Sequence, residues 1–101
     1  MPSEIKNRRT TPRAKLGQSV RIRSFESPPR DEICTTVNVS RRGIYFVTSV
    51  SYYYAGMDVA VTRGFELNDP LNREENGEVI RVEKLPNGQW GIAIRLLGAR
   101  Q

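Results

Sequence analysis

The sequence predicts an all-β domain in which six short antiparallel strands form a small barrel or sandwich, with closure into a six-stranded β-barrel favoured. Six segments show period-two alternation or runs of β-branched and aromatic residues, and turn-forming residues separate them at short intervals. No segment has the periodicity of a strongly amphipathic helix. The 101 residues suffice for one modest hydrophobic core. Closure is favoured because a barrel leaves no exposed edge strand in so small a sheet.

The first strand is predicted within residues 16–25, where apolar side chains alternate with arginines. Val20 and Ile22 are expected on one face, and Arg21 and Arg23 on the other. This pattern is typical of a half-buried strand. Two consecutive prolines then break it.

The second strand is predicted over residues 33–40, again from alternation. Its two faces are expected to hold Ile33, Thr35, Val37 and Val39 on one side, and Cys34, Thr36, Asn38 and Ser40 on the other. Asn38 and Ser40 would therefore share a face just before a turn. Gly43 is expected to supply the positive φ of that turn, and residues 44–47 (Ile-Tyr-Phe-Val) begin the third strand.

Residues 49–56, which include three consecutive tyrosines, are interpreted as a connector with room for a helical turn, packed partly on one end of the barrel. Alternation resumes in the fourth strand, at residues 57–63. A loop is predicted at residues 68–72, where Asn-Asp-Pro-Leu-Asn breaks the pattern.

The last two strands, residues 78–83 and 89–96, form the clearest predicted pair. They flank Pro86-Asn87-Gly88, and Asn-Gly is the strongest short signal for a β-hairpin. In the sixth strand, one face is expected to enter the core with Trp90, Ile92, Ile94 and Leu96.

The composition favours a binding protein over an enzyme. The chain has no histidine, the commonest general base and metal ligand, so zinc sites and Ser-His or Cys-His catalysis are excluded. Its single cysteine, Cys34, forms no intrachain disulfide and is expected to pack as a small hydrophobic residue. No metal and no cofactor are expected.

No run of apolar residues is long enough to span a bilayer, and no apolar segment follows the initial methionine. These features predict a soluble, unsecreted protein of the cytoplasm that does not insert into membranes.

The net charge of +5 is unevenly distributed along the chain. Residues 6–23 carry seven basic and no acidic side chains, so this part is expected to meet an anionic partner. Residues 1–15, which contain two prolines and no apolar periodicity, are interpreted as a flexible basic arm. Residues 16–98 are assigned to the barrel.

Two short motifs point to a binding site. The first is Arg9-Thr10-Thr11-Pro12-Arg13 in the arm, and the second is Asn38-Val39-Ser40-Arg41-Arg42-Gly43 at a strand end. Guanidinium groups bind phosphates, pair with base edges and stack on planar rings. Taken singly, the first motif would pass for a solvated basic tail and the second for ordinary turn chemistry. Their pairing favours a planar ligand that carries phosphate.

In these two motifs the chain resembles the PilZ domain family, which has Arg-x-x-x-Arg in an N-terminal arm and Asp/Asn-x-Ser-x-x-Gly on a barrel. Residues 77–82 and 88–94 also resemble the closing hairpin of that family. The resemblance implies a six-stranded antiparallel β-barrel of the split-barrel kind, in bacteria, that binds the second messenger cyclic di-GMP without transforming it. Such a domain acts as a receptor or adaptor and signals to a protein effector, here unknown.

The resemblance implies a ligand site made of Arg8, Arg9, Arg13, Asn38, Ser40, Gly43 and Arg81. The arm arginines would clamp the ligand, with Arg8 as an auxiliary to phosphate. Arg81 is assigned because it is expected to share a strand face with Val79 and matches an inward-facing family position; the alternative is a solvated or ion-paired arginine. Asn38 stands where many family members have Asp, and a carboxamide accepts hydrogen bonds through one oxygen only.

Two other functions remain open at this stage. A small basic barrel with an arginine-rich arm could bind RNA or single-stranded DNA, with steep salt dependence, although the paired motifs favour the dinucleotide and no nucleic acid is expected as partner. The barrel could also be a protein-interaction module that binds no ligand.

Overall fold

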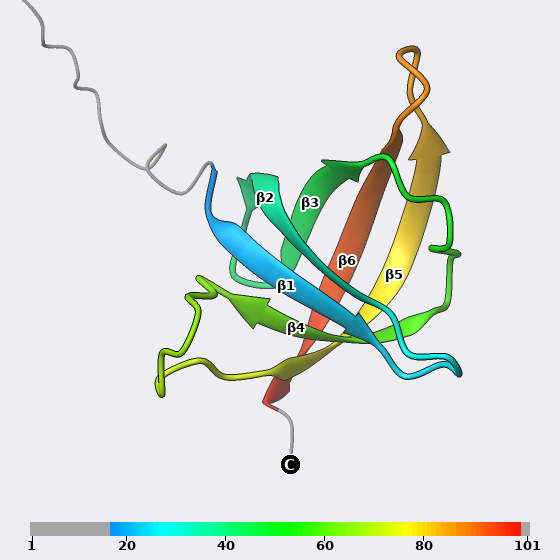
Figure 1. Cartoon of the computed structure of the whole chain (residues 1–101). Helices are drawn as coiled ribbons and strands as arrows, with labels where there is room; N and C mark the ends of the chain where they lie inside the picture. The colour runs from blue at the N-terminus through cyan, green and yellow to red at the C-terminus, as the bar shows by residue number, and fades with distance from the viewer. Residues whose placement is uncertain (1–16, 100–101) are drawn as a thin grey trace, which may run out of the picture.

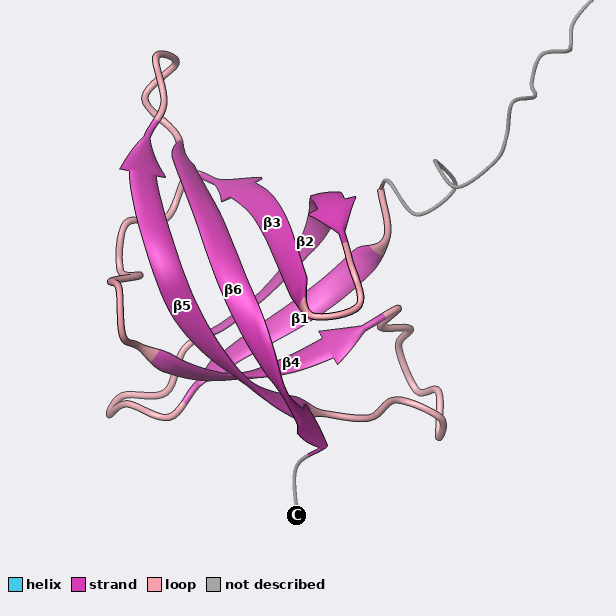
Figure 2. Ribbon diagram, turned by 180° about the vertical axis from the view of Figure 1, so that it is seen from behind, coloured by secondary structure: helices cyan, strands magenta, loops and turns pink. Residues whose placement is uncertain are grey.

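The computed structural model describes residues 17–99, which form one closed antiparallel barrel of six strands without any helix (Figure 1). The predicted fold class is therefore confirmed. The order around the barrel is β1-β2-β3-β6-β5-β4, so β1 lies on the wall opposite β6 (Figures 1 and 2). The strands are β1 (Ser19–Ser24), β2 (Asp31–Val39), β3 (Gly43–Thr48), β4 (Asp58–Arg63), β5 (Glu75–Lys84) and β6 (Trp90–Ala99).

The core fills the inside of the barrel and draws on every wall. Its largest fully buried side chains are Phe46, Ile22, Met57, Ile92, Ile94, Val20, Val59, Val61 and Val79. Alternation works as predicted in β1 and β6: Val20 and Ile22 point inward, and Trp90 packs against the edge of the core. Each such aliphatic side chain contributes about 1.5–3 kcal/mol through burial.

The β3–β4 connector closes one end of the barrel without forming a helical turn. Tyr53 is buried, with its ring 5.6 Å from that of Phe46 in an edge-to-face arrangement. Its hydroxyl donates to Glu32 at 2.6 Å, and Thr48 donates to the other oxygen of the same carboxylate at 2.5 Å. Burial, and next the bond to Glu32, raise the pKa of the Tyr53 phenol. Packing of the tyrosines on the barrel end is thus confirmed, while Tyr54 stays half exposed.

The β5–β6 hairpin turns at Pro86-Asn87-Gly88, as predicted. Gly88 has φ +88°, and its amide donates to the carbonyl of Leu85 at 2.9 Å. The Asn87 side chain accepts from the amide of Gln89 at 3.0 Å, which fixes the loop locally. The tip of this hairpin projects beyond the rest of the barrel (Figure 2).

Three β-bulges interrupt strict alternation, in β2 at Val37, in β5 at Ile80 and in β6 at Leu97. The first two of them affect the predicted site residues. In β2, Thr36 is 3% exposed and faces the core, whereas Asn38 lies exposed on the outside. The predicted common face of Cys34, Thr36, Asn38 and Ser40 is therefore wrong, because the extra residue reverses the pattern. The partly buried Val39 packs against the core instead.

Candidate ligand site on the outer face of the barrel

Four side chains form a row across the outer face of four neighbouring strands. Asn38 of β2 pairs with Tyr45 of β3, Tyr45 with Ala93 of β6, and Ala93 with Arg81 of β5. Directly paired residues of antiparallel strands project to the same side of the sheet. The bulges at Val37 and Ile80 therefore place Asn38 and Arg81 on one stretch of the outer wall, which is formed by β5, β6, β3 and the end of β2 (Figure 2).

A hollow of about 200 Å³ opens beside this row. Three residues predicted from the sequence, Asn38, Ser40 and Gly43, lie together in its wall. The sequence did not single out the other lining residues, which are Ile44, Tyr45, Ile80, Ala93 and Ile94. Ile80 follows the inward-facing Val79, lies on the outside and is 50% exposed.

The turn between β2 and β3 is held tightly from both sides. The amide of Ser40 donates to the carbonyl of Gly43 at 2.9 Å, and the amide of Leu96 donates to the carbonyl of Arg42 at 2.8 Å. Gly43 does not have the predicted positive φ. A Cβ at position 43 would lie 3.1 Å from the backbone oxygen of Ile94, a tight contact that favours glycine there. Close approach of two strands, and not turn conformation, explains the residue.

Arg81 lies on the outer wall, so its predicted common face with Val79 is wrong. Val79 is fully buried, while the Arg81 side chain is 62% exposed, because Ile80 is the extra residue between them. The guanidinium lies 6.0 Å from the ring centre of Tyr45 and 3.6 Å from a carboxylate oxygen of Glu83. Arg81 thus stands at the end of the row that contains Asn38.

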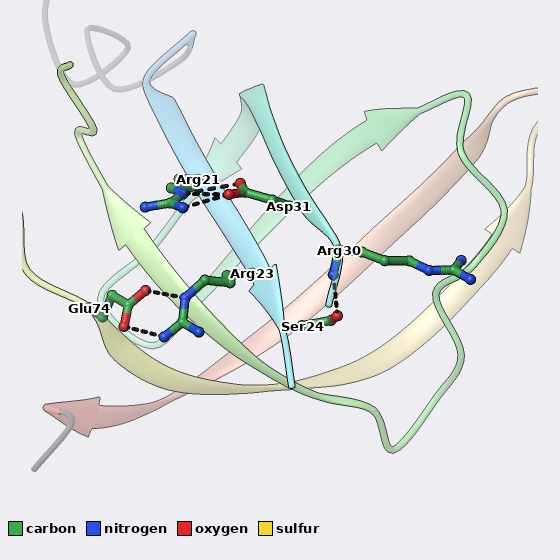
Figure 3. A network of polar contacts seen from close by, with 6 residues as sticks. All are labelled: Arg21, Arg23, Ser24, Arg30, Asp31 and Glu74. Atoms are coloured by element: carbon green, nitrogen blue, oxygen red, sulfur yellow. Dashed lines mark hydrogen bonds and ion pairs between the residues drawn. The ribbon is translucent and has the colours of Figure 1, made fainter. Parts of the chain in front are cut away.

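The arginines of β1 and those of the β2–β3 turn differ in their partners. On β1, Arg21 binds Asp31 and Arg23 binds both oxygens of Glu74 at 2.7 Å (Figure 3). These two members of the basic stretch are therefore engaged within the barrel. In contrast, Arg41 and Arg42 have no ion-pair or ring partner among residues 17–99, although they sit in the turn that forms the hollow.

Arg8, Arg9 and Arg13 lie outside the described residues, as does the rest of the predicted arm. The described chain nevertheless begins close to the hollow. The amide of Gly17 donates to the carbonyl of Thr36 at 3.0 Å, and Thr36 in turn donates its amide to Gln18 at 2.9 Å. Thr36 is two residues from Asn38, so the described chain begins beside the bulged end of β2.

Cys34 lies before the bulge and packs against the core. Burial, followed by the nearby Glu32 carboxylate, raises its pKa to about 12. Within the described chain, no group of three or more Cys, Asp and Glu side chains is arranged to hold a metal ion. Nor do residues 17–99 contain a helix that could cross a membrane.

Comparison of the chain with known protein families, with curated proteins and with solved structures gives no match. The site is therefore defined by its own geometry: a small hollow on the outer barrel wall, lined by a carboxamide, a hydroxyl and apolar side chains, next to two arginines without partners in the described chain.

Proposed function

We propose that this protein binds cyclic di-GMP without transforming it and passes the signal to a protein partner. The observation that carries the proposal is the meeting of Asn38, Ser40 and Gly43 around one hollow. The motif residues could have been scattered by the strand register. Their convergence on the outer wall, next to the point where the arm joins the barrel, supports a shared ligand.

The hollow suits one base of the ligand. Its volume of about 200 Å³ is below the range of pockets that enclose a whole drug-sized molecule, which begins at about 300 Å³. Apolar side chains such as Ala93 and Ile80 offer contact to a flat ring, and the Asn38 carboxamide can accept from a guanine N–H edge. The phosphates and the second base would then lie outside the hollow.

Arginines are available for those remaining groups. Arg41 and Arg42 lie in the chain between Ser40 and Gly43, which line the hollow, and they have no acidic partner among residues 17–99, so their charge is available for a phosphate. Arg13 precedes Gly17 by four residues, a length of chain that spans at most about 14 Å. Arg9 can reach about twice as far. In the proposed mechanism the arm closes over the ligand, and the combined surface is what the partner binds.

Titration calorimetry with cyclic di-GMP tests the proposal, with cyclic di-AMP and GTP as control ligands. We expect saturable binding of cyclic di-GMP only. Arg9→Ala and Arg13→Ala should each weaken it about tenfold or more, since hydrogen bonds of charged groups contribute about 1.5–3 kcal/mol. Ser40→Ala should weaken it about two- to tenfold, since a neutral hydrogen bond contributes about 0.5–1.5 kcal/mol. Arg63→Ala is the matched control, because Arg63 is ion-paired with Glu75 at 2.9 Å on β4, away from the hollow.

No binding by the native chain would reject the proposal and leave a protein-interaction module. Unchanged binding in both arm variants would reject the clamp. A third outcome, binding of RNA of many sequences with a steep loss of affinity on added salt, would identify a nucleic-acid-binding barrel instead.

A further inference from the structure

The side chain of Tyr45 extends from β3 across the outer face of the neighbouring strand β6. Its hydroxyl donates to an oxygen of Glu83 at 2.8 Å, two strands away on β5. To reach Glu83 the phenol lies across β6 above Gly91. A Cβ on Gly91 would overlap the Tyr45 hydroxyl and would lie 2.8 Å from its Cζ atom. The missing side chain of Gly91 is therefore what makes room for the ring.

We infer that Tyr45 is a positioning residue of the ligand site, held as a fixed wall of the hollow by Glu83 and Gly91. The inference rests on the proposed function and extends it to residues outside both motifs. Tyr45 itself lines the hollow, whereas Gly91 and Glu83 do not. Their role is to determine where the ring stands.

Glu83 anchors two groups at once. One of its oxygens accepts from Tyr45 at 2.8 Å, and the other lies 3.6 Å from Arg81. The hydrogen bond to Glu83 raises the pKa of the Tyr45 phenol, so the hydroxyl remains a donor at neutral pH. Arg81, 6.0 Å from the ring centre, adds a cation–π contact. The three side chains fix one another at the edge of the hollow.

The neighbouring residues explain why this anchoring matters for a ligand. Gly91 and Ala93 are successive residues on the outer face of β6, and Ala93 lines the hollow. Ala93 leaves space above itself because its side chain is one methyl group. A Tyr45 ring that is expelled from its place above Gly91 can therefore move over Ala93 and occupy space that the ligand base needs.

The test is a double-mutant cycle read by calorimetry with cyclic di-GMP on the full chain. Gly91→Ala should weaken binding about tenfold, since overpacking forces the ring out of its rotamer. In a Tyr45→Ala background the same Gly91→Ala change should cause no further loss. Tyr45→Phe, which loses the bond to Glu83, should also weaken binding. Tyr54→Phe is the matched control, because its hydroxyl donates to Glu26 elsewhere on the surface.

A second measurement separates this inference from the proposed function. In ligand-free protein, the NMR signal of the Ala93 methyl group should shift in Gly91→Ala and not in Tyr54→Phe. Native-like binding by Gly91→Ala, or equal losses from Gly91→Ala with and without Tyr45, would overturn the positioning role. If the native chain binds no cyclic di-GMP, the proposed function fails, and an unmoved Ala93 signal in Gly91→Ala would then reject the inference on its own.

Discussion

Even-numbered side chains lie on opposite faces of the barrel wall at the two ends of β2. Before the bulge, Cys34 and Thr36 face the barrel interior, and Thr36 is 3% exposed. After the bulge, Asn38 is exposed and lines the hollow on the outer wall. The three side chains have the same spacing along the sequence. One extra residue, Val37, decides which of them is structural and which is available to a ligand.

The same device occurs in β5, where Val79 is fully buried and Arg81 is on the outside. The extra residue there is Ile80. The two bulges lie on strands that flank β3 and β6, so they direct Asn38 and Arg81 to opposite ends of one row. A bulge thus changes the face of the sheet on which a residue lies, while the residue stays in the same strand.

Cysteine labelling at pH 8 gives the largest expected contrast between the two ends of β2. Cys34 should react at least about tenfold more slowly than Asn38→Cys made in a Cys34→Ala background. The Cys34 thiol has its pKa raised to about 12, so it stays protonated until the pH approaches that value, whereas a free thiol ionises near about 8.5. In denaturant the two rates should converge. Equal rates in the native state would mean that the bulge does not reverse the faces.

Gly77, which faces the barrel interior, and Gly91, on the outer face, should differ in how much a substitution by alanine destabilises the fold. A Cβ on the inward-facing Gly77 would lie 2.8 Å from Ile94 and 3.1 Å from Val61, so Gly77→Ala should lower the free energy of unfolding by about 1–3 kcal/mol. That corresponds to a fall in Tm of about 4–8 °C per kcal/mol. Gly91→Ala is the control, because its Cβ meets side-chain atoms that can rotate away. If calorimetric melting shows a larger loss of stability for Gly91→Ala than for Gly77→Ala, the assignment of Gly77 to the tightly packed interior would be wrong.

Arg23 of β1 and Arg81 of β5 should also differ in how much they stabilise the fold, by a smaller amount. Arg23 makes two bonds of 2.7 Å to Glu74, and both side chains are about two-thirds covered. Arg23→Ala should therefore cost about 1 kcal/mol of unfolding free energy. Arg81→Ala should change it by less than about 0.5 kcal/mol, since its contact with Glu83 is long and exposed. Urea denaturation measures both, and equal losses would assign Arg81 a structural role.

The smallest expected effect concerns Asn38 itself. Asn38→Asp should tighten cyclic di-GMP binding about threefold, because a carboxylate accepts two charge-assisted hydrogen bonds from a guanine edge. The stability should stay close to native, because the side chain is exposed. Weaker binding by Asn38→Asp in calorimetry would show that position 38 does not accept from the ligand.

The fold could be predicted because its signals are local. Alternation in β1 and β6 and the Asn-Gly turn at residues 87–88 depend on neighbours along the chain, and each is found where it was expected. The site could be predicted only in part. Asn38, Ser40 and Gly43 belong to a recognisable motif, whereas Tyr45, Ile80 and Ala93 become neighbours only through strand pairing.

By itself, the amino-acid sequence determined six strands, one barrel and a polar turn with a glycine behind it. Local preferences of side chains and turns suffice for those features. Only the tertiary structure decided which face each polar residue occupies, how closely the backbone of β6 approaches Gly43, and which arginines are already paired. Bulges, close strand approach and ion pairs depend on residues far apart in the chain, so no local pattern specifies them.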